Sequence, residues 1–179
     1  MNGAVGKIAS SVSLFFGGLF AGFLVAVLVI ELTLRNFDRT VYTQVRQVML
    51  EWLDLLAAAT LVPTLIAAAL LVSTAARMRG RALWLTLTAL ILLVVVFALS
   101  LVVNVPINTE QLDWDVLAPP ADWASVRDRW QIAHALRTGA AVLAFGSLCA
   151  AAIGTSPTGG GPKRTDSAPS ASRHGAHHG

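Results

Sequence analysis

Charged side chains are scarce in this chain: they make up 13% of its 179 residues, whereas hydrophobic residues make up 55%. A soluble globular domain carries about 25% charged residues. Cysteine is scarcer still, because Cys149 stands alone and cannot form a disulfide within the chain. The basic residues are dispersed around the ends of the apolar stretches described below, so their excess does not indicate a nucleic-acid partner. These absences favour a membrane protein of one domain.

The chain is instead rich in long stretches without charge. A helix needs about 20 apolar residues, and at least about 17, to cross a bilayer. Three stretches are that long, and a fourth becomes long enough when it includes His134 and Arg137. The first stretch is too long for a signal-peptide core and is expected to remain in the protein. We predict an all-α fold, a four-helix transmembrane bundle over residues 1–153, with helices at about 11–32, 52–76, 82–103 and 130–153.

The charges that do occur differ in sign between the two ends of this predicted bundle. Basic residues dominate the N-terminus, the tail and the short second connection, which holds Arg77, Arg79 and Arg81. At the other end, which comprises the first and third connections and the adjoining helix ends, nine acidic residues outnumber five basic ones. Because Lys and Arg collect on the cytoplasmic side, we predict a multi-pass protein of the cell membrane with both termini in the cytoplasm. Residues 154–179, rich in Gly, Ser, Pro and His, are predicted to be a disordered cytoplasmic tail.

The third connection begins at Asn104-Val105-Pro106-Ile107-Asn108. Pro106 is expected to end the third helix there, because proline breaks helical hydrogen bonding. The acidic stretch from Thr109 to Arg129 is then predicted to be an outer capping loop, since a loop of this length is usually structured. Three tryptophans are expected in the lipid headgroup belt. Trp114 and Trp123 belong to this loop, and Trp130 is the first residue of the predicted fourth helix.

Polar side chains gather where the fourth helix begins. Trp130, His134 and Arg137 are spaced four and three apart, so they share one helix face. A charge set into a membrane helix costs about 2.5–3.5 kcal/mol on insertion scales, and such a residue normally faces the bundle interior and finds a partner. The alternatives are that Arg137 reaches outward to the headgroups or forms a purely structural ion pair. Its candidate partners at the same boundary are Glu31, Glu51, Asp54, Asn104 and Asn108.

His134 has three interpretations. Imidazole titrates near neutral pH, so it suits a general base beside carboxylates. It also suits a metal ligand with those carboxylates, or a structural histidine. No second membrane histidine, Glu-x-x-His pair or cysteine cluster accompanies it, so we predict no metal site. The histidines of the tail, His174, His177 and His178, lie in a segment that offers no preorganised site.

These motifs together resemble a known family. The Asn-Val-Pro-Ile-Asn stretch, the Trp-x-x-x-His-x-x-Arg-Thr pattern from Trp130 to Thr138 and the glycine-rich first helix are similar to the anthrone-oxygenase-like family of small four-helix membrane proteins. The resemblance covers about residues 10–153. It implies oxidation of polycyclic aromatic anthrones to quinones by molecular oxygen without a tightly bound cofactor. It implicates Asn104, Asn108, Trp130, His134 and Arg137. The basic tail and the long acidic loop depart from the family's pattern.

The first functional hypothesis is therefore an oxygenase that acts on a lipophilic aromatic molecule in a polar pocket facing the outer leaflet. His134 would remove a proton, and Arg137 and Asn104 would stabilise the resulting anion electrostatically. The residues expected to bind the substrate are Asn108, Trp130, Glu31 and Asp54. Membrane lipid and a lipophilic small molecule are the partners that this hypothesis implies.

The second hypothesis is a membrane accessory or scaffold protein without enzymatic activity. Gly18 and Gly22 form a Gly-x-x-x-Gly pattern, which lets helix backbones approach closely. That approach occurs either inside one bundle or between two copies of the chain, which would make a homo-oligomer. A small transporter is less favoured, because the first three helices carry no charge at mid-membrane and no inverted repeat is evident.

Overall fold

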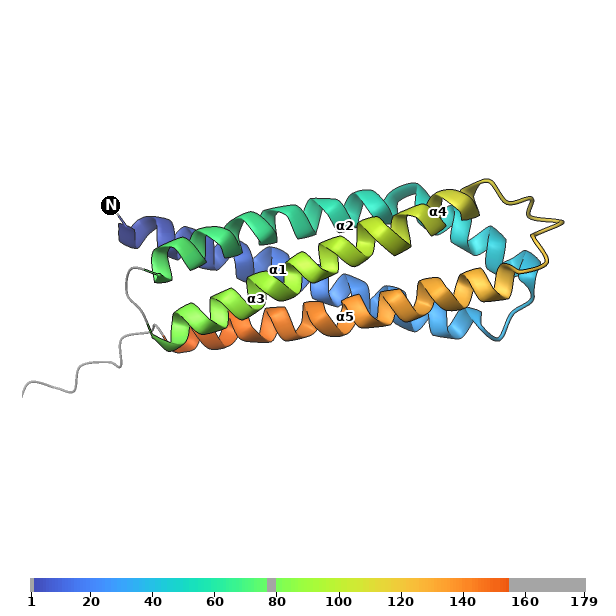
Figure 1. Cartoon of the computed structure of the whole chain (residues 1–179). Coiled ribbons are helices and arrows are strands. Elements are labelled where there is room, and N and C mark those ends of the chain that lie inside the picture. The colour runs from blue at the N-terminus through green and yellow to red at the C-terminus, as the bar shows by residue number, and fades with distance from the viewer. Residues whose placement is uncertain (1, 77–79, 155–179) are drawn as a thin grey trace, which may run out of the picture.

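The computed structural model describes residues 2–76 and 80–154 of the chain, and these residues form helices and connections only (Figure 1). The first helix is α1 (Asn2–Leu34) and the second is α2 (Arg39–Ala75). The third rod runs without a break through α3 (Arg81–Leu99), the π-helix η1 (Ser100–Asn104) and α4 (Val105–Leu112). The last helix is α5 (Trp123–Gly154). Each of the four rods is long and apolar enough to cross a membrane, which confirms the predicted all-α bundle.

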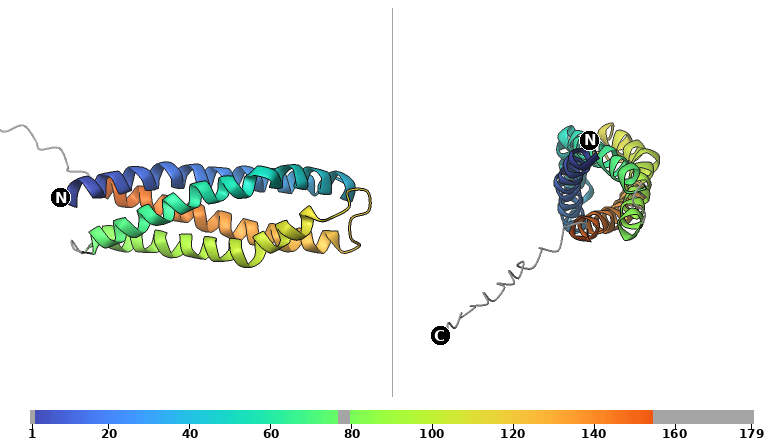
Figure 2. Two further views of the ribbon diagram at one scale, coloured as in Figure 1. Left: turned by 90° about the horizontal axis from the view of Figure 1, so that it is seen from above. Right: turned by 90° about the vertical axis from the view of Figure 1, so that its left-hand side faces the viewer.

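The four rods stand at the corners of a square when the bundle is viewed along its axis (Figure 2). α1 packs against α2 and α5, and the third rod packs against the same two helices. Successive rods run antiparallel (Figure 1). The beginning of α1 and the end of α5 lie at the same end of the bundle. The placement of this end in the cytoplasm stays a prediction. Residues 77–79 and the predicted disordered tail from residue 155 onward lie outside the described residues.

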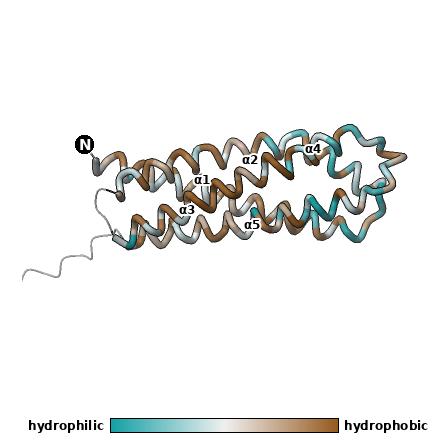
Figure 3. Tube along the Cα trace, viewed as in Figure 1, coloured by the Kyte–Doolittle hydropathy of each residue, from teal (hydrophilic) through white to brown (hydrophobic). Residues whose placement is uncertain are grey.

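The opposite end of the bundle is the more hydrophilic one and is called the polar end below (Figure 3). It holds Glu31, Arg46, Asn108 and Gln131, which hydrogen bonds join to one another. Its helices are longer than their apolar stretches predicted. α2 starts at Arg39 because Asp38 caps it, with its Oδ1 accepting from the backbone N–H of Thr40 at 2.9 Å. The 37 residues of α2 span about 55 Å, compared with about 30 Å for the hydrocarbon core of a bilayer. α2 is therefore longer than a bilayer crossing requires, and its first turns form part of the polar end.

The prediction that the third helix ends near Val103 is wrong. The backbone N–H of Val105 donates to the Ser100 carbonyl, which is the wider spacing of a π-helix. Pro106 then falls in the first turn of α4, where a missing N–H is tolerated. The rod continues to Leu112, so the connection to α5 spans only residues 113–122 instead of the predicted loop from Thr109 to Arg129.

The tryptophans divide between the core and the surface. Trp52 and Trp84 are each 69% exposed near opposite ends of the apolar region, as membrane-boundary anchors would be. Trp114 and Trp130 are buried in an aromatic core at the polar end, so their predicted place in the headgroup belt is wrong. Trp123 is half-buried, with its ring 5.5 Å from that of Tyr42.

Two glycines of the first helix behave differently. A Cβ on Gly18 would lie 3.2 Å from the ring of Phe145 in α5, so Gly18 serves close packing inside one bundle. A Cβ on Gly22 would meet nothing within 4 Å. A homo-oligomer through these residues stays a prediction.

Candidate functional site

Two buried arginines organise the polar end, and the first is Arg46 of α2. Its Nη1 forms an ion pair with Glu31 Oε1 of α1 at 2.8 Å, and the two side chains are 2% and 0% exposed. Its Nε donates to Gln111 Oε1 at 3.0 Å and its Nη2 to Asn108 Oδ1 at 2.9 Å. The guanidinium also lies 4.1 Å from the centre of the Trp130 ring. Arg46 thus connects all four rods with its charge fully paired.

The neighbours of Arg46 complete a closed set of hydrogen bonds. Trp130 Nε1 donates to Asn108 Oδ1 at 2.6 Å, and Asn108 Nδ2 donates to both carboxylate oxygens of Asp54 at 2.8 and 3.0 Å. Gln131 Nε2 donates to the Glu31 backbone carbonyl and to its carboxylate at 2.9 and 3.1 Å. We call Glu31, Arg46, Asp54, Asn108, Gln111, Trp130 and Gln131 the Arg46 network.

The four residues predicted to bind substrate all belong to the Arg46 network. Glu31, Asn108 and Trp130 are buried and bonded to protein partners, and Asp54 is exposed at the edge. The structure therefore brings the predicted set together, with its polar groups engaged mainly with one another. Their role in binding a substrate stays a prediction.

The sequence analysis did not predict a buried role for Arg46, because its segment has the composition of a polar connection between helices. One signal could have found it. Tyr42, Arg46 and Leu50 are spaced four apart and lie on one helix face, and all three are buried. An arginine within an otherwise core-forming stripe needs a buried acid, and Glu31 ends the preceding apolar stretch.

The second buried arginine is Arg137 of α5, which is 7% exposed and faces the bundle interior as predicted. Its Nε donates to His134 Nδ1 at 3.1 Å and its Nη1 to Ser100 Oγ at 2.9 Å. Among the described residues, none of the predicted acids or amides bonds to it directly, although the charge of Asp54 acts on it across a shared crevice. Within the part of the chain that the structure describes, no ion pair joins it to a carboxylate. The reason is that Glu31 is paired with Arg46, while Asp54 is bonded to Asn108.

His134 is held between two fixed partners. Its Nε2 lies 3.0 Å from the Leu24 carbonyl, which can only accept, so the ring proton is on Nε2. Its Nδ1 then carries the lone pair that accepts from Arg137. The imidazole also stacks on Trp130 at 4.7 Å between ring centres. His134 is thus a neutral acceptor whose basic nitrogen faces Arg137.

Asn104 is buried in η1 and has an unused acceptor. Its Nδ2 donates to the Trp130 backbone carbonyl at 3.3 Å, but its Oδ1 has no hydrogen-bond partner among the residues that the structure describes. The opposite amide orientation would set oxygen against oxygen at Trp130, so this assignment is the better one. A buried acceptor without a partner costs about 1–3 kcal/mol. We call Ser100, Asn104, His134 and Arg137 the Arg137 array.

The two groups of residues lie at different depths. At about 1.5 Å per residue, Ser100 is about 24 Å along the third rod from Trp84, and Asn108 is about 36 Å from it. With Trp84 at one boundary and a hydrocarbon core of about 30 Å, Ser100 falls inside the apolar region and Asn104 at its edge. The Arg46 network falls at its edge or beyond. The Arg137 guanidinium, which is bonded to Ser100, therefore lies inside the apolar region but close to its edge at the polar end.

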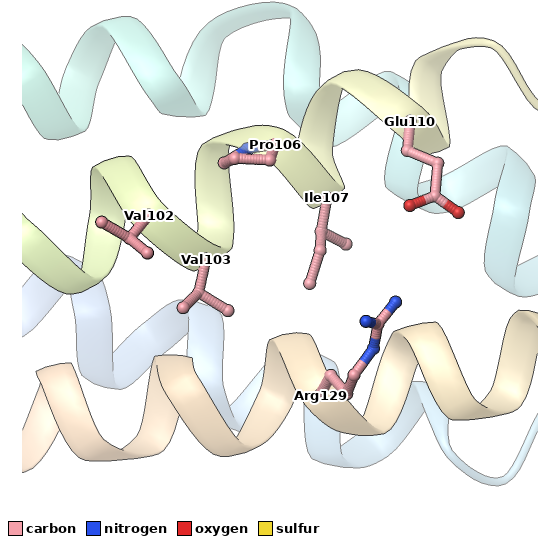
Figure 4. Close-up of a pocket in the computed structure, with 6 residues that line it drawn as sticks. All are labelled: Val102, Val103, Pro106, Ile107, Glu110 and Arg129. Carbon is pink, nitrogen blue, oxygen red and sulfur yellow. The ribbon is translucent and has the colours of Figure 1, made fainter.

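A small crevice lies between the two arginines, and a larger groove lies on the flank of the bundle. A crevice that touches Arg46, Asp54, Trp130 and Arg137 has a volume of about 10 Å³, which suits one water molecule at most. A groove of about 330 Å³ lies on the flank of the bundle between the third rod and α5 (Figure 4). The groove has the size of a small ligand site. No cluster of three His, Cys, Asp or Glu side chains suited to a metal ion occurs in residues 2–76 and 80–154.

Comparison with known proteins places this geometry in a family. The family model described as anthrone oxygenase matches residues 49–147, which is more than half of the chain. The chain belongs to the anthrone oxygenase family. No curated protein and no solved structure matches it.

The segment matched by the anthrone oxygenase family model contains one of the two groups of residues in full and the other only in part. All four members of the Arg137 array lie inside the matched segment. The ion pair of the Arg46 network lies outside it, because Glu31 and Arg46 precede residue 49. Within this family member, the unpaired arginine thus belongs to the matched segment, whereas the paired one is supplied by the preceding part of the chain.

Proposed function

We propose that this anthrone oxygenase family member oxidises a lipophilic aromatic substrate with molecular oxygen, without a bound cofactor, and that the Arg137 array is its reaction centre. The observation that carries the proposal is the burial of Arg137 with no carboxylate within ion-pair distance among the described residues. With both termini in the cytoplasm, as the charge pattern predicts, this centre faces the outer leaflet. A lipophilic substrate would reach it from the membrane.

The proposal follows from comparing the two arginines. The charge of Arg46 is compensated by Glu31 at 2.8 Å, so no further anion is needed there. Arg137 donates hydrogen bonds to the neutral groups of His134 and Ser100, and within the described part of the chain it forms no ion pair with a carboxylate. An anion that forms beside Arg137 supplies the missing negative charge. In a low-dielectric site this stabilises the anion more than the neutral substrate, which is the requirement for lowering a barrier.

An anthrone-type substrate develops such an anion. It carries a methylene group activated by a ketone through the ring system, so loss of one proton gives an enolate. In the proposed reaction, the proton passes to His134 Nδ1 and the negative charge to the substrate oxygen near Arg137. The carbanion form of the enolate gives its electrons to oxygen, and protonation yields a hydroperoxide. Loss of water from the hydroperoxide leaves a second ketone, so one O₂ yields one quinone and one water.

The hydrogen bonds give His134 and Arg137 coupled roles. His134 Nδ1 accepts a proton from substrate only when the Arg137 Nε–H no longer occupies its lone pair. A developing enolate competes for that same guanidinium. The movement of Arg137 from imidazole to enolate would therefore free the base as the anion forms. The unpaired Oδ1 of Asn104 is available to accept a hydrogen bond from a substrate hydroxyl.

The experiment uses the full chain in lipid nanodiscs with anthrone, following quinone absorbance and oxygen uptake above the spontaneous rate in empty nanodiscs. Wild type is expected to accelerate both in a ratio of one O₂ to one quinone. The variant His134→Gln should lower the rate at least about 100-fold, the usual scale for loss of a general base. Arg39→Gln, an exposed change at the same end of the bundle, is the matched control. No acceleration by folded wild type, or full activity in folded His134→Gln, would contradict the proposal.

A further inference from the structure

The groove on the flank of the bundle combines apolar walls with a charged end. Four apolar side chains of the third rod form its walls: Val102, Val103, Pro106 and Ile107. Glu110 of α4 and Arg129 of α5 stand at the end that lies nearer the connection between these helices (Figure 4). No member of the Arg46 network or the Arg137 array is among the described residues that line it. The groove is therefore separate from the proposed reaction centre.

The two charged residues of the groove face the same space without neutralising each other. Figure 4 shows the Arg129 guanidinium pointing across the groove toward the helix that carries Glu110. No ion pair joins these two side chains among the described residues, and both residues are exposed. A purely anionic ligand would be repelled by Glu110, and a purely cationic one by Arg129. The pair thus matches a ligand that carries one charge of each sign.

The position of the groove along the bundle matches the headgroup layer of a bilayer. Counted from Trp84, Val102 lies about 27 Å along the rod and Glu110 about 39 Å. At a tilt of about 20°, which is usual for membrane helices, these lengths become depths of about 25 and 37 Å. With Trp84 at one boundary, the hydrocarbon core ends at about 30 Å and the headgroups extend about 5–7 Å further. The apolar walls therefore begin inside the core, and the charged end lies at the level of the headgroups.

Exposed apolar faces continue from the groove toward the centre of the bundle. On the third rod, Val95 lies two turns before Val102 on the same helix face. On α5, Ile132 and Leu136 follow Arg129 by three and seven residues and share its face. All of these apolar side chains are exposed. Acyl chains can follow the two faces while a headgroup occupies the groove, whose volume of about 330 Å³ is at the lower end for ligand sites.

We propose that this groove binds a phospholipid with a zwitterionic headgroup and a primary amine, which is the chemistry of phosphatidylethanolamine. The lipid phosphate binds the Arg129 guanidinium, and the lipid ammonium donates to the Glu110 carboxylate. Phosphatidylcholine fits less well because its quaternary ammonium has no N–H to donate. Phosphatidylglycerol fits less well because it brings no positive charge to Glu110. This inference goes beyond the proposed oxygenase function and does not depend on it.

Competition between headgroups tests the groove. The full chain in mild detergent is titrated with dioleoyl phosphatidylethanolamine, phosphatidylcholine or phosphatidylglycerol, and native mass spectrometry measures the lipid-bound fraction. The acyl chains are identical, so differences in binding come from the headgroup. Wild type should bind the ethanolamine lipid about fivefold more tightly than either of the others, which is the upper end for one exposed ion pair.

Substitutions in the groove should change this preference in different ways. Glu110→Gln should lower binding of the ethanolamine lipid to the level of the choline lipid, whose own binding stays about the same. Arg129→Gln should weaken binding of both lipids about fivefold, because both carry the phosphate. Val102→Phe, which fills the groove, should weaken binding of all three lipids.

Three matched controls lie outside the groove. Arg39→Gln and Glu51→Gln remove exposed charges at the same end of the bundle, and Val29→Phe enlarges an exposed apolar residue of α1. All three should bind the lipids like wild type.

Three results would overturn the inference. The first is equal binding of the three lipids by wild type, and the second is a preference that Glu110→Gln leaves intact. The third is a dimer that Val102→Phe dissociates without any change in lipid binding, because a second copy of the chain would then be the occupant.

Discussion

Replacing Arg46 by Met should destabilise the protein strongly, because it breaks a fully buried ion pair. Arg46 bonds to Glu31, Gln111 and Asn108 at 2.8–3.0 Å and covers the Trp130 ring. Its removal leaves the Glu31 carboxylate buried, with Gln131 as its remaining side-chain donor. Breaking a buried pair on one side typically lowers the free energy of unfolding by about 3–5 kcal/mol.

A double-mutant cycle separates the loss of unfolding free energy that comes from the orphaned Glu31 carboxylate from the rest of the effect of Arg46→Met. In Arg46→Met the orphaned carboxylate accounts for most of the loss, so the further change Glu31→Gln should restore part of it. We expect the double variant to be at least about 1.5 kcal/mol more stable than the sum of the single changes predicts. Arg137→Met is the matched control, because it removes a buried arginine that has no carboxylate partner. Its free energy of unfolding should stay within about 1 kcal/mol of wild type.

The assay is reversible unfolding in mixed micelles, followed by tryptophan fluorescence, since Trp114 and Trp130 are buried in the affected core. Single-step transitions with equal denaturant dependence are needed for the comparison. A loss below about 1 kcal/mol for Arg46→Met, or strict additivity in the cycle, would refute the structural role of the ion pair. An equally large loss for Arg137→Met would refute the distinction between the two arginines.

Three further predictions concern packing, the π-turn and orientation. Gly18→Leu should destabilise the bundle by about 1–3 kcal/mol in the same unfolding assay, because its Cβ position lies 3.2 Å from Phe145, whereas Gly22→Leu should be tolerated. If Gly22→Leu instead dissociates an oligomer in analytical ultracentrifugation, the homo-oligomer hypothesis gains its support. Asn104→Leu should leave the free energy of unfolding unchanged or raise it by up to about 1 kcal/mol while lowering turnover, since it removes an acceptor without a partner; a large loss of stability would count against this. Cysteine labels at both termini should react with a membrane-impermeant reagent only after cells are opened, and labelling of intact cells would reverse the predicted orientation.

The helices were predictable because the bilayer imposes a strong compositional rule. Stretches of about 20 apolar residues stand out in a chain with little charge, and each of them is helical in the structure. Their ends were not predictable from hydropathy, because the helices continue past the apolar stretches. Asp38 shows the missing signal, since a capping residue rather than a change of hydropathy starts α2. The prediction that Pro106 ends the third helix failed because a π-turn precedes it, and this places the proline in the first turn of α4.

For the candidate site, the sequence predicted which residues lie close together better than it predicted which of them pair. The spacing of Trp130, His134 and Arg137 places them on one face of α5, and all three are buried. Which acid pairs with which arginine depends on distances between helices, and a sequence does not contain those distances. Arg46 reaches Glu31 from a segment that hydropathy assigns to a connection. The groove beside Arg129 is likewise a product of how the third rod packs on α5.

The central claim is that Arg137 is held as an unpaired buried cation for the sake of an anionic intermediate. The most direct test measures anthrone turnover and the free energy of unfolding together for wild type and Arg137→Gln in the same nanodisc or micelle preparations. We predict a fall in turnover of about 100-fold or more with stability unchanged or raised, because the charge contributes to the reaction and not to the fold. Turnover that survives the change, or turnover and stability that fall in parallel, would contradict the account.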